Sequence, residues 1–478
     1  MNATPDPLPS DSEVVFTPAR DLVRRLAARD LGAEELMTRF LTRIDEVNPA
    51  VNAIVTLEPE AALEGARVAD AALARGEPPG PLHGLPVAVK DLTVTRGIRT
   101  TFGSPIYRDF VPDEDALYVE RLRAAGAIII GKTNTPEFGA GSQTFNPVFG
   151  ATRNPYARER TCGGSSGGAA VAVACGMLPV ADGTDMGGSL RNPASWSNVV
   201  GFRTSPGRVP VWPRNMLYNP LGVAGPIARH VADAALLLSA MAGPDLRVPL
   251  SIETPGARFR EPLERNFRGT RVAWSPTLGG YPVEPAVVAV CGAAAARLEE
   301  LGCMVEEADP DLRDADEIFQ TLRAFSFAMA HEEHIREHRE KMKDTVVWNV
   351  EKGLALGAMD VAHAEIKRAA LLDRVVGFFG RFDYLVCPTT QVPPFPVDTD
   401  WVREINGVKL ETYIDWMAAC YAITVTGCPS ISVPAGFTPD GLPVGIQIVA
   451  PPKCDFEALQ LAHAYEGVTD FAARRPPL

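Results

Sequence analysis

The sequence lacks an excess of positive charge. Its 478 residues include 46 Lys and Arg against 59 Asp and Glu, which gives a formal net charge of −13. Proteins that bind nucleic acid or anionic membranes gather cations on one surface, because phosphate groups attract them. We therefore expect neither a nucleic acid nor a membrane among the partners of this chain.

Long apolar runs are also missing. The longest stretch of small apolar residues, 167–181, is interrupted by Gly176 and Pro179 and is shorter than the roughly 20 residues that a membrane-spanning helix needs. Residues 1–14 contain neither Lys nor Arg nor an apolar run, unlike a secretory signal. These features favour a cytoplasmic protein.

Cysteine pairs with metal-binding or redox spacing are absent as well. The eight cysteines contain no C-x-x-C pair and lie far apart, so we expect reduced thiols rather than a disulfide framework or a zinc ribbon. Cys162 borders a glycine-rich loop, but no histidine lies near it in the sequence. A small buried residue is therefore the favoured interpretation of Cys162.

Histidine is scarce, with seven residues in the whole chain. His331 and His334 do not complete the metal-binding motif H-E-x-x-H, because Ile335 stands where the second histidine belongs. The charged residues around them predict a solvated helix face. We expect no metal and no cofactor.

The order of apolar segments predicts an α/β fold. Short apolar runs at 85–89 and 127–130 have the character of buried strands, and a helical segment at 116–125 lies between them. Strand, helix and strand in succession favour a sheet covered by helices on both faces. Strand character returns at 384–388 and in the apolar runs between 430 and 449, and we expect these strands to rejoin the first sheet.

Helices are predicted in the rest of the chain. Thr17 is the expected cap of one helix that runs to Ile44, and a second helix over 58–74 ends at a Pro/Gly cluster. Helical patterns dominate between 243 and 380. We expect one domain over residues 1–478, with a core of about 60–235 and 380–460 and a helical excursion over about 243–380.

Three segments carry residues suited to catalysis. The first ends a buried apolar run with Lys90, and burying an ammonium is costly unless it is paired or neutralised. Taken alone, such a lysine more often pairs with a neighbour such as Asp91 or reaches the surface. The second is the glycine-rich loop 161–168, which contains Ser165 but no phosphate-loop or dinucleotide motif. Most loops of this kind are only turns.

The third segment, 183–193, places Ser189 after a run of flexible residues. It lacks the G-x-S-x-G motif of α/β-hydrolases. Consecutive backbone N–H groups can bind the oxyanion of an acyl-transfer reaction, and here the candidates are those of Met186, Gly187, Gly188 and Ser189. Asp182 and Asp185 resemble a carboxylate pair, but we expect both to be structural.

Together, in this order and spacing, the three segments resemble the amidase signature family. Residues 85–91 are similar to the segment with the family's catalytic lysine, 163–168 to the loop whose first serine follows a cis peptide bond, and 183–191 to the nucleophile segment. Further similarity lies at 131–138, 225–233 and 441–447, and none was found over about 243–380. The resemblance implies an α/β fold with a mixed β-sheet core covered by helices on both faces.

The resemblance also implies a proton relay, in which Lys90 accepts a proton from Ser165, Ser165 accepts one from Ser189, and Ser189 attacks the carbonyl. A serine hydroxyl needs a base, and no histidine lies in the three segments. A lysine serves only when neutral, which requires its pKa to fall about 3 units from 10.4, at a cost of roughly 4 kcal/mol. Desolvation at a strand end favours the neutral amine.

The substrate is less well defined by the sequence. The resemblance places Phe138 and Gly139 at the acyl pocket, and residues 211–218 are expected to complete it. Their apolar and aromatic character favours small, uncharged substrates. The leading hypothesis is a serine hydrolase that cleaves C–N acyl bonds of apolar or aryl amides through an acyl-enzyme, with anilides, carbamates (urethanes) and esters as further candidates. The oligomeric state stays open.

The alternative is the glutamine-hydrolysing subunit of a tRNA-dependent amidotransferase complex. Against it, Arg191, Asn192 and Pro193 stand where that subunit usually has Arg-Gln-Pro. Residues 195–198 likewise depart from its usual Phe-Cys.

Overall fold

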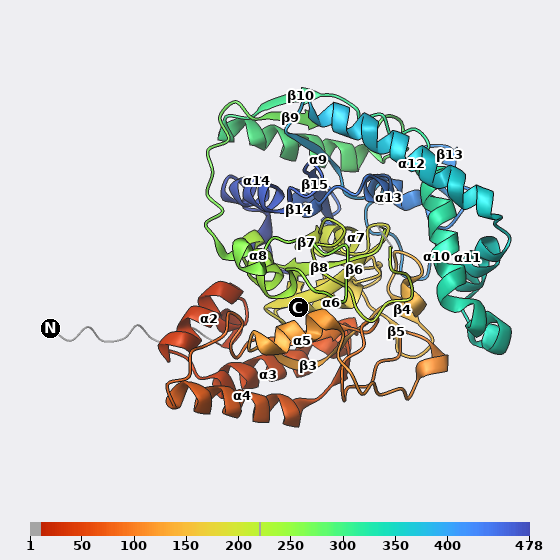
Figure 1. Ribbon diagram of the computed structural model, residues 1–478. Coiled ribbons are helices and arrows are strands. Elements are labelled where there is room, and N and C mark those ends of the chain that lie inside the picture. The colour runs from red at the N-terminus through yellow and green to blue at the C-terminus, as the bar shows by residue number, and fades with distance from the viewer. Residues whose placement is uncertain (1–10, 219–220) are drawn as a thin grey trace.

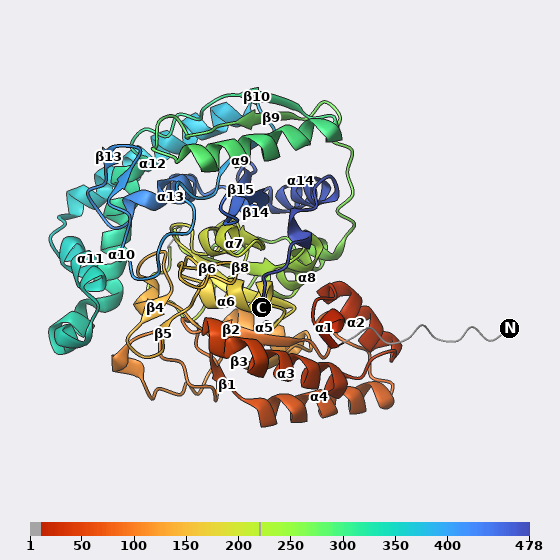
Figure 2. The ribbon, with the colours of Figure 1, turned by 180° about the vertical axis from the view of Figure 1, so that it is seen from behind.

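The computed structural model describes residues 11–218 and 221–478 (Figure 1). Two sheets form its framework, one with three strands in the order β1-β3-β2 and one with eight in the order β10-β9-β11-β15-β14-β7-β8-β6. Helices surround both sheets, as the opposite view in Figure 2 also shows. Within the described ranges, no helix combines the length and the apolarity needed to cross a membrane.

The small sheet carries Lys90 at the end of its edge strand. It consists of β1 (Ile54–Leu57), β2 (Pro86–Lys90) and β3 (Ile128–Thr133), with β2 parallel and β1 antiparallel to β3. All five residues of β2 are buried. The helix α5 (Leu117–Ala124) connects β2 to β3, so the predicted strand, helix and strand are present.

The large sheet holds the segment that leads to Ser189. Strands β9, β10 and β11 are parallel to one another, and the remaining neighbours are antiparallel, so the sheet is mixed. Its strands are β6 (Val180–Asp185), β7 (Val200–Arg203), β8 (Val223–Ala228), β9 (Arg271–Trp274), β10 (Met304–Glu307), β11 (Tyr384–Pro388), β14 (Ser430–Phe437) and β15 (Pro443–Val449).

The expectation that the C-terminal strands rejoin the first sheet is wrong. β11, β14 and β15 pair with β9, with one another and with β7, while β2 pairs with β3. At the end of β2 that packs against β6, the N–H of Lys90 donates to the carboxylate of Asp182 at 3.0 Å. The carboxylate of Asp182 thus accepts the backbone N–H of Lys90 in place of a carbonyl of a neighbouring strand.

A buried helix joins the two sheets. Every residue of α6 (Gly167–Ala174) is buried, and the helix contacts β1, β2 and β3 as well as β6 and β8. It starts two residues after Ser165, which places that serine at the junction of the sheets. The other helices near the sheets are α7 (Arg191–Trp196), α8 (Val231–Met241), α9 (Pro285–Ala296) and α14 (Asp455–Gly467).

Helices far along the sequence form one flank of the molecule, coloured teal to blue in Figure 1. They are α10 (Ala315–His338), α11 (Asp344–Leu354) and α12 (Ala358–Phe379). The fully buried helix α13 (Ala418–Thr426) lies inside them and contacts α10 and α12. The stretch 243–380 was expected to be helical, but it also contributes β9 and β10 to the edge of the large sheet. Both strands were missed because each has only four residues. In addition, β10 is mostly exposed and carries two glutamates.

The N-terminal region differs from the predicted single helix. After α1 (Asp11–Val14) the chain forms α2 (Ala19–Ala28) and α3 (Ala33–Val51), separated at Arg29, whose φ of 61° is left-handed. Thr17 does not cap α2. The N–H groups of Ala19 and Arg20, the first two residues of α2, instead donate to the carboxylate of Asp233, at 2.9 and 3.0 Å. The helix predicted over 58–74 is confirmed as α4 (Pro59–Ala74).

Candidate active site

Lys90 is fully buried and lies among hydroxyl groups. Its Nζ is 2.7 Å from Ser165 Oγ, 2.8 Å from Ser166 Oγ and 3.0 Å from Thr184 Oγ1. Burial lowers the pKa of Lys90 to about 7, although the carboxylates of Asp182 and Asp185 partly oppose the change. A substantial fraction of this amine is therefore neutral near pH 7.

The neighbouring carboxylate does not neutralise Lys90. Asp91 accepts hydrogen bonds from the backbone N–H and the hydroxyl of Thr101, at 3.0 and 2.5 Å. The ordinary alternative, a Lys90–Asp91 pair, is thus not what the structure contains. The amine is left among neutral hydroxyls, where desolvation decides its protonation.

Ser165 is held by a tightly packed loop. The Gly164–Ser165 peptide bond is cis, in agreement with the loop that the sequence resembles. The hydroxyls of Ser142 and Thr144 donate to the carbonyls of Gly164 and Gly163, each at 2.8 Å. These bonds fix the two residues before Ser165 and hold its hydroxyl at Lys90.

Gly139 approaches the same hydroxyl from the other side. Its φ of +69° is left-handed, and a Cβ there would lie 2.9 Å from Leu92 Cδ1 and 3.5 Å from Ser165 Oγ. Glycine suits both the conformation and the close approach. Phe138, the preceding residue, also has a positive φ, of 48°.

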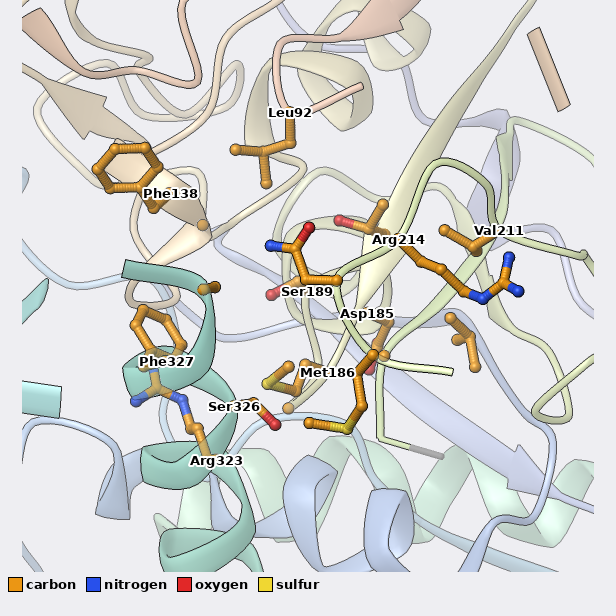
Figure 3. Close-up of a pocket in the computed structure, with 18 of the residues that line it drawn as sticks. Leu92, Phe138, Asp185, Met186, Ser189, Val211, Arg214, Arg323, Ser326 and Phe327 are labelled. Carbon is orange, nitrogen blue, oxygen red and sulfur yellow. The ribbon is translucent and has the colours of Figure 1, made fainter. Parts of the chain in front are cut away.

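Ser189 follows β6 and lines the same cavity as Ser165 (Figure 3). The two loops are tied together, because the N–H of Ser166 donates to the carbonyl of Ser189 at 3.1 Å. Among the described residues, Ser189 Oγ has no hydrogen-bond partner. Its hydroxyl is half-buried and available to a bound molecule.

Of the four N–H groups expected to bind an oxyanion, that of Gly188 is not available. The N–H of Gly188 donates to Asp185 Oδ1 at 3.0 Å, so its hydrogen is already used. Within the part of the chain that the structure describes, the N–H groups of Met186, Gly187 and Ser189 have no acceptor. A β-carbon at Gly188 would lie 2.6 Å from the Cβ of Cys420, which fixes this residue as glycine.

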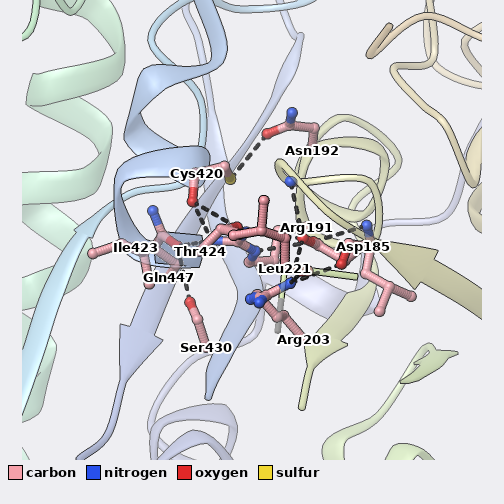
Figure 4. Close-up of polar contacts among 12 residues, drawn as sticks. Asp185, Arg191, Asn192, Arg203, Leu221, Cys420, Ile423, Thr424, Ser430 and Gln447 are labelled. Atoms are coloured by element: carbon pink, nitrogen blue, oxygen red, sulfur yellow. Dashed lines mark hydrogen bonds and ion pairs between the residues drawn. The ribbon is translucent and has the colours of Figure 1, made fainter. Parts of the chain in front are cut away.

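Asp185 is bound to the loop of Ser189 and to two arginines (Figure 4). Besides Gly188, it accepts from the N–H of Leu190 at 3.1 Å and from the guanidinium groups of Arg191 and Arg203 at 3.0–3.2 Å. Burial would raise its pKa, but these two cations outweigh burial and lower it. Asp185 is therefore an ionised structural group, as expected.

Arg191 extends this support to the C-terminal part of the chain. One of its nitrogens donates to the carbonyl of Cys420 and to Gln447 Oε1, and another donates to Thr424 Oγ1, each at 3.0 Å. Cys420 and Thr424 lie on α13, and Gln447 lies on β15. Figure 4 shows the arginine between Asp185 and these residues.

The cavity in front of the serines has a volume of about 450 Å³. As expected from the sequence, Phe138 and Gly139 line it. Of residues 211–218, Val211 and the run 213–217 line it as well. Figure 3 shows Phe138 and Phe327 on one side of this space, opposite Val211 and Arg214.

The helix α10 contributes a further wall, and none of its lining residues was assigned to the cavity from the sequence. Its lining residues are Arg323, Ser326, Phe327, Met329, Ala330 and His331. Three of them, Arg323, Phe327 and His331, recur at the i, i+4 spacing of one helix face. That spacing was a usable signal, but nothing local indicates that the face turns toward a loop almost 200 residues earlier.

The prediction of a solvated face at His331 and His334 is wrong. The ring of His331 packs on Phe138 with centroids 4.3 Å apart, and His334 Nε2 lies 2.7 Å from the hydroxyl of Tyr107. Burial lowers the pKa of His331 to about 3. The prediction failed because the charged neighbours, including Glu332 and Glu333, occupy the other, exposed side of the same helix.

Cys162 is a buried residue, as expected. It is fully inaccessible, and its Sγ lies 3.5 Å from the carbonyl of Thr152. Burial raises the pKa of its thiol to about 12. A thiolate is the reactive form of cysteine, so Cys162 is unsuited to nucleophilic attack.

A family model described as Amidase matches residues 35–459, which include all three loops of the site. The chain belongs to the amidase signature family. Among curated members it is similar to an acylamidase of Rhodococcus erythropolis, with 37% identity over 461 residues, covering 96% of each protein. It is also 35% identical to a glutamyl-tRNA(Gln) amidotransferase subunit of Moorella thermoacetica, over 98% of this chain and 99% of that protein.

Similarity to solved structures of the amidase signature family leads to the same result. A bacterial aryl acylamidase of the family superposes with a TM-score of 0.91 at 30% identity, covering 97% of this chain and all of that one. The expected mixed α/β fold of the family is therefore confirmed. The chain is an amidase signature hydrolase, an enzyme that acts on carbon–nitrogen bonds other than peptide bonds.

Proposed function

We propose that this amidase cleaves small, mainly apolar or aryl amides through an acyl-enzyme on Ser189, with Ser165 as proton shuttle and Lys90 as base. The main support is the 2.7 Å distance between Lys90 Nζ and Ser165 Oγ, both of which belong to buried residues. Burial brings the pKa of Lys90 to about 7, which suits a group that must accept a proton near neutral pH.

The proposed relay moves one proton in each direction. Lys90 accepts the proton of Ser165 as Ser165 accepts that of Ser189, and Ser189 Oγ bonds to the carbonyl carbon. The N–H groups of Met186, Gly187 and Ser189 stabilise the resulting oxyanion. Lys90 then returns a proton to Ser165 while Ser165 gives its own proton to the leaving nitrogen, and the C–N bond breaks to leave the acyl group on Ser189. Water, activated by the same relay, releases the acid.

One contact of the relay forms only in the reacting complex under this proposal. Ser189 Oγ has no hydrogen-bond partner among the described residues, so its bond to Ser165 must close when substrate enters. Catalytic hydrogen bonds in unliganded enzymes are often long and shorten in the reacting complex. The tie between Ser166 N–H and the carbonyl of Ser189 keeps the two loops adjacent meanwhile.

The substrate class rests on the cavity and on the relatives. A space of about 450 Å³ suits a small aryl compound, and Phe138, Phe327, Val211 and Leu217 make its wall apolar. Two similar proteins are named as an acylamidase and an aryl acylamidase. Anilides, aryl carbamates (urethanes) and esters share the acyl geometry that this site requires, and we include them in the proposal.

The test is turnover by the purified protein of an aryl amide, an aryl carbamate and a long-chain amide, each compared with the Ser189→Ala variant. We expect the aryl compounds to be cleaved and the long-chain amide to be poor. If the enzyme cleaved none of the three compounds, the proposed substrate class would be refuted.

A second candidate is glutamine hydrolysis within an amidotransferase complex, favoured by the 35% identity to the Moorella protein. Asn192 argues against it. Its Nδ2 donates to Ser142 Oγ at 2.7 Å, and Cys420 Sγ lies 3.1 Å from its Oδ1, so this residue is built into the site. Glutaminase activity that appears only on adding partner subunits would favour this candidate.

A further inference from the structure

His331 brings a polar group to an otherwise apolar part of the cavity wall. It lies on α10, lines the cavity, and packs between Phe138 and Phe327, with centroid distances of 4.3 and 5.7 Å. Its Nδ1 is 3.1 Å from Nδ1 of His334. The other ring nitrogen, Nε2, points away from that bond and has no partner among the described residues.

Other polar side chains of α10 at the cavity already have protein partners. The guanidinium of Arg323 donates to Asn349 and, at 2.7 Å, to the hydroxyl of Tyr413. The hydroxyl of Ser326 donates to the carbonyl of Leu322 at 2.8 Å. Nε2 of His331, by contrast, is a ring nitrogen on this wall without any hydrogen-bond partner among the described residues, so it is open to a ligand.

A chain of hydrogen bonds fixes the ring of His331. It runs from the hydroxyl of Tyr107 to His334 Nε2, at 2.7 Å, and from His334 Nδ1 to His331 Nδ1, at 3.1 Å. If Tyr107 donates, His334 donates to His331, and Nε2 of His331 carries a hydrogen into the cavity. If His334 donates to Tyr107, every bond reverses, and Nε2 presents a lone pair instead.

We propose that His331 Nε2 is a specificity-determining group that donates a hydrogen bond to a second carbonyl of the substrate, remote from the scissile bond. Tyr107 and His334 are positioning residues that set its tautomer. This inference rests on the proposed function and narrows its substrate class to aryl amides and carbamates that carry a second hydrogen-bonding group.

His331 offers the substrate an uncharged hydrogen-bonding group. Burial and the nearby ring of His334 lower the pKa of His331 to about 3, so the imidazole is uncharged at neutral pH. The titratable side chains of Glu333, Glu337 and His338 influence the pKa of His334, and none of them raises the pKa of His331. A neutral imidazole can donate or accept one hydrogen bond without binding an ion.

The first experiment compares matched substrates on the full-length enzyme. An anilide with an acetyl group on the ring is paired with the isopropenyl analogue of the same shape, and a second pair carries these groups on the acyl side. His331→Phe keeps an aromatic ring against Phe138 but removes Nε2. His338→Phe, at the end of the same helix, is the control variant.

We expect His331→Phe to lower kcat/KM about tenfold for the acetyl compound in at least one pair, the value of one neutral hydrogen bond, and to leave the isopropenyl analogue unchanged. His338→Phe should preserve the ratio of kcat/KM for the acetyl compound to kcat/KM for the isopropenyl analogue. An unchanged ratio in both pairs, or an equal loss for both members, would overturn the inference. Lack of turnover of every compound by the unaltered enzyme would instead overturn the proposed function.

The positioning residues are tested by a readout other than activity. In the ¹⁵N NMR spectrum of the imidazoles, Tyr107→Phe removes the end of the chain and should shift the ring-nitrogen signals of His331 toward a different tautomer mixture. The preference for the acetyl compound should fall, with the change in KM rather than kcat. Unaltered signals together with an unaltered preference would show that Tyr107 and His334 do not position His331.

Discussion

Asp182 binds the backbone of Lys90 rather than its side chain. The carboxylate accepts the Lys90 N–H at 3.0 Å and the hydroxyl of Tyr118 at 2.8 Å, while Lys90 Nζ lies among hydroxyl groups. A direct ion pair would hold the amine in its charged form. Because the carboxylate is engaged elsewhere, burial prevails and the pKa of Lys90 falls to about 7.

Replacing the base should abolish catalysis without unfolding the enzyme. We expect Lys90→Met to lower kcat/KM for an aryl amide by about 10²–10⁴-fold, the usual contribution of general-base catalysis. Steady-state kinetics and circular dichroism measure the two effects. Lys341→Met on the surface is the control. A Lys90→Met variant with near-normal activity would remove lysine from the mechanism.

The pH profile should report the same amine. The base works when neutral, so kcat/KM should fall tenfold per pH unit below about 7 and level off above it. A rate profile from pH 5 to pH 9 on a substrate that does not ionise in this range provides the measurement. Activity that is flat down to pH 5 would contradict the assignment.

Stability should depend on pH through Lys90 in a defined direction. Its folded pKa, about 7, lies below its unfolded value of 10.5, so the unfolded chain binds more protons between these values. The free energy of unfolding should therefore rise with pH across this window, by up to about 1.4 kcal/mol per unit. Denaturant titrations of the unaltered enzyme and Lys90→Met should diverge there, and parallel curves would show that Lys90 is not buried.

Removing the charge of Asp185 should destabilise the fold as well as the site. Asp185→Asn leaves the guanidinium groups of Arg191 and Arg203 buried without a counter-charge, at a cost of about 3–5 kcal/mol. Chemical denaturation measures this loss. Asp400→Asn, which breaks an exposed pair with Arg403, should have little effect. Equal stability of the two variants would argue against a structural role for Asp185.

The nucleophile can be identified directly. A fluorophosphonate should label Ser189, and mass spectrometry of the peptide that contains residues 183–193 should locate the modification. Ser189→Ala should remove the label, whereas Ser239→Ala on α8, away from the site, should retain it. Labelling of Cys162 or of Ser165 in the unaltered enzyme would transfer the nucleophile to that residue.

The residues of the proposed relay could be predicted because they lie in short local motifs. Lys90, Ser165 and Ser189 each lie in a short contiguous segment, so their residue types and spacing were visible in the sequence. The wall from α10 was not, because its face turns toward Phe138 only through tertiary packing. The direction of a single N–H group, that of Gly188, follows from a loop conformation with φ of +114°, which residue types do not specify.

The bonds that Arg191 makes to Cys420, Thr424 and Gln447 couple the nucleophile loop to the end of the chain. During synthesis on the ribosome, Ser189 emerges long before these partners exist. The loop therefore obtains its final bracing only when β15 has been translated. A chain that stops before this strand contains every residue of the proposed relay, but it lacks the Gln447 side chain that holds Arg191 beneath the nucleophile loop.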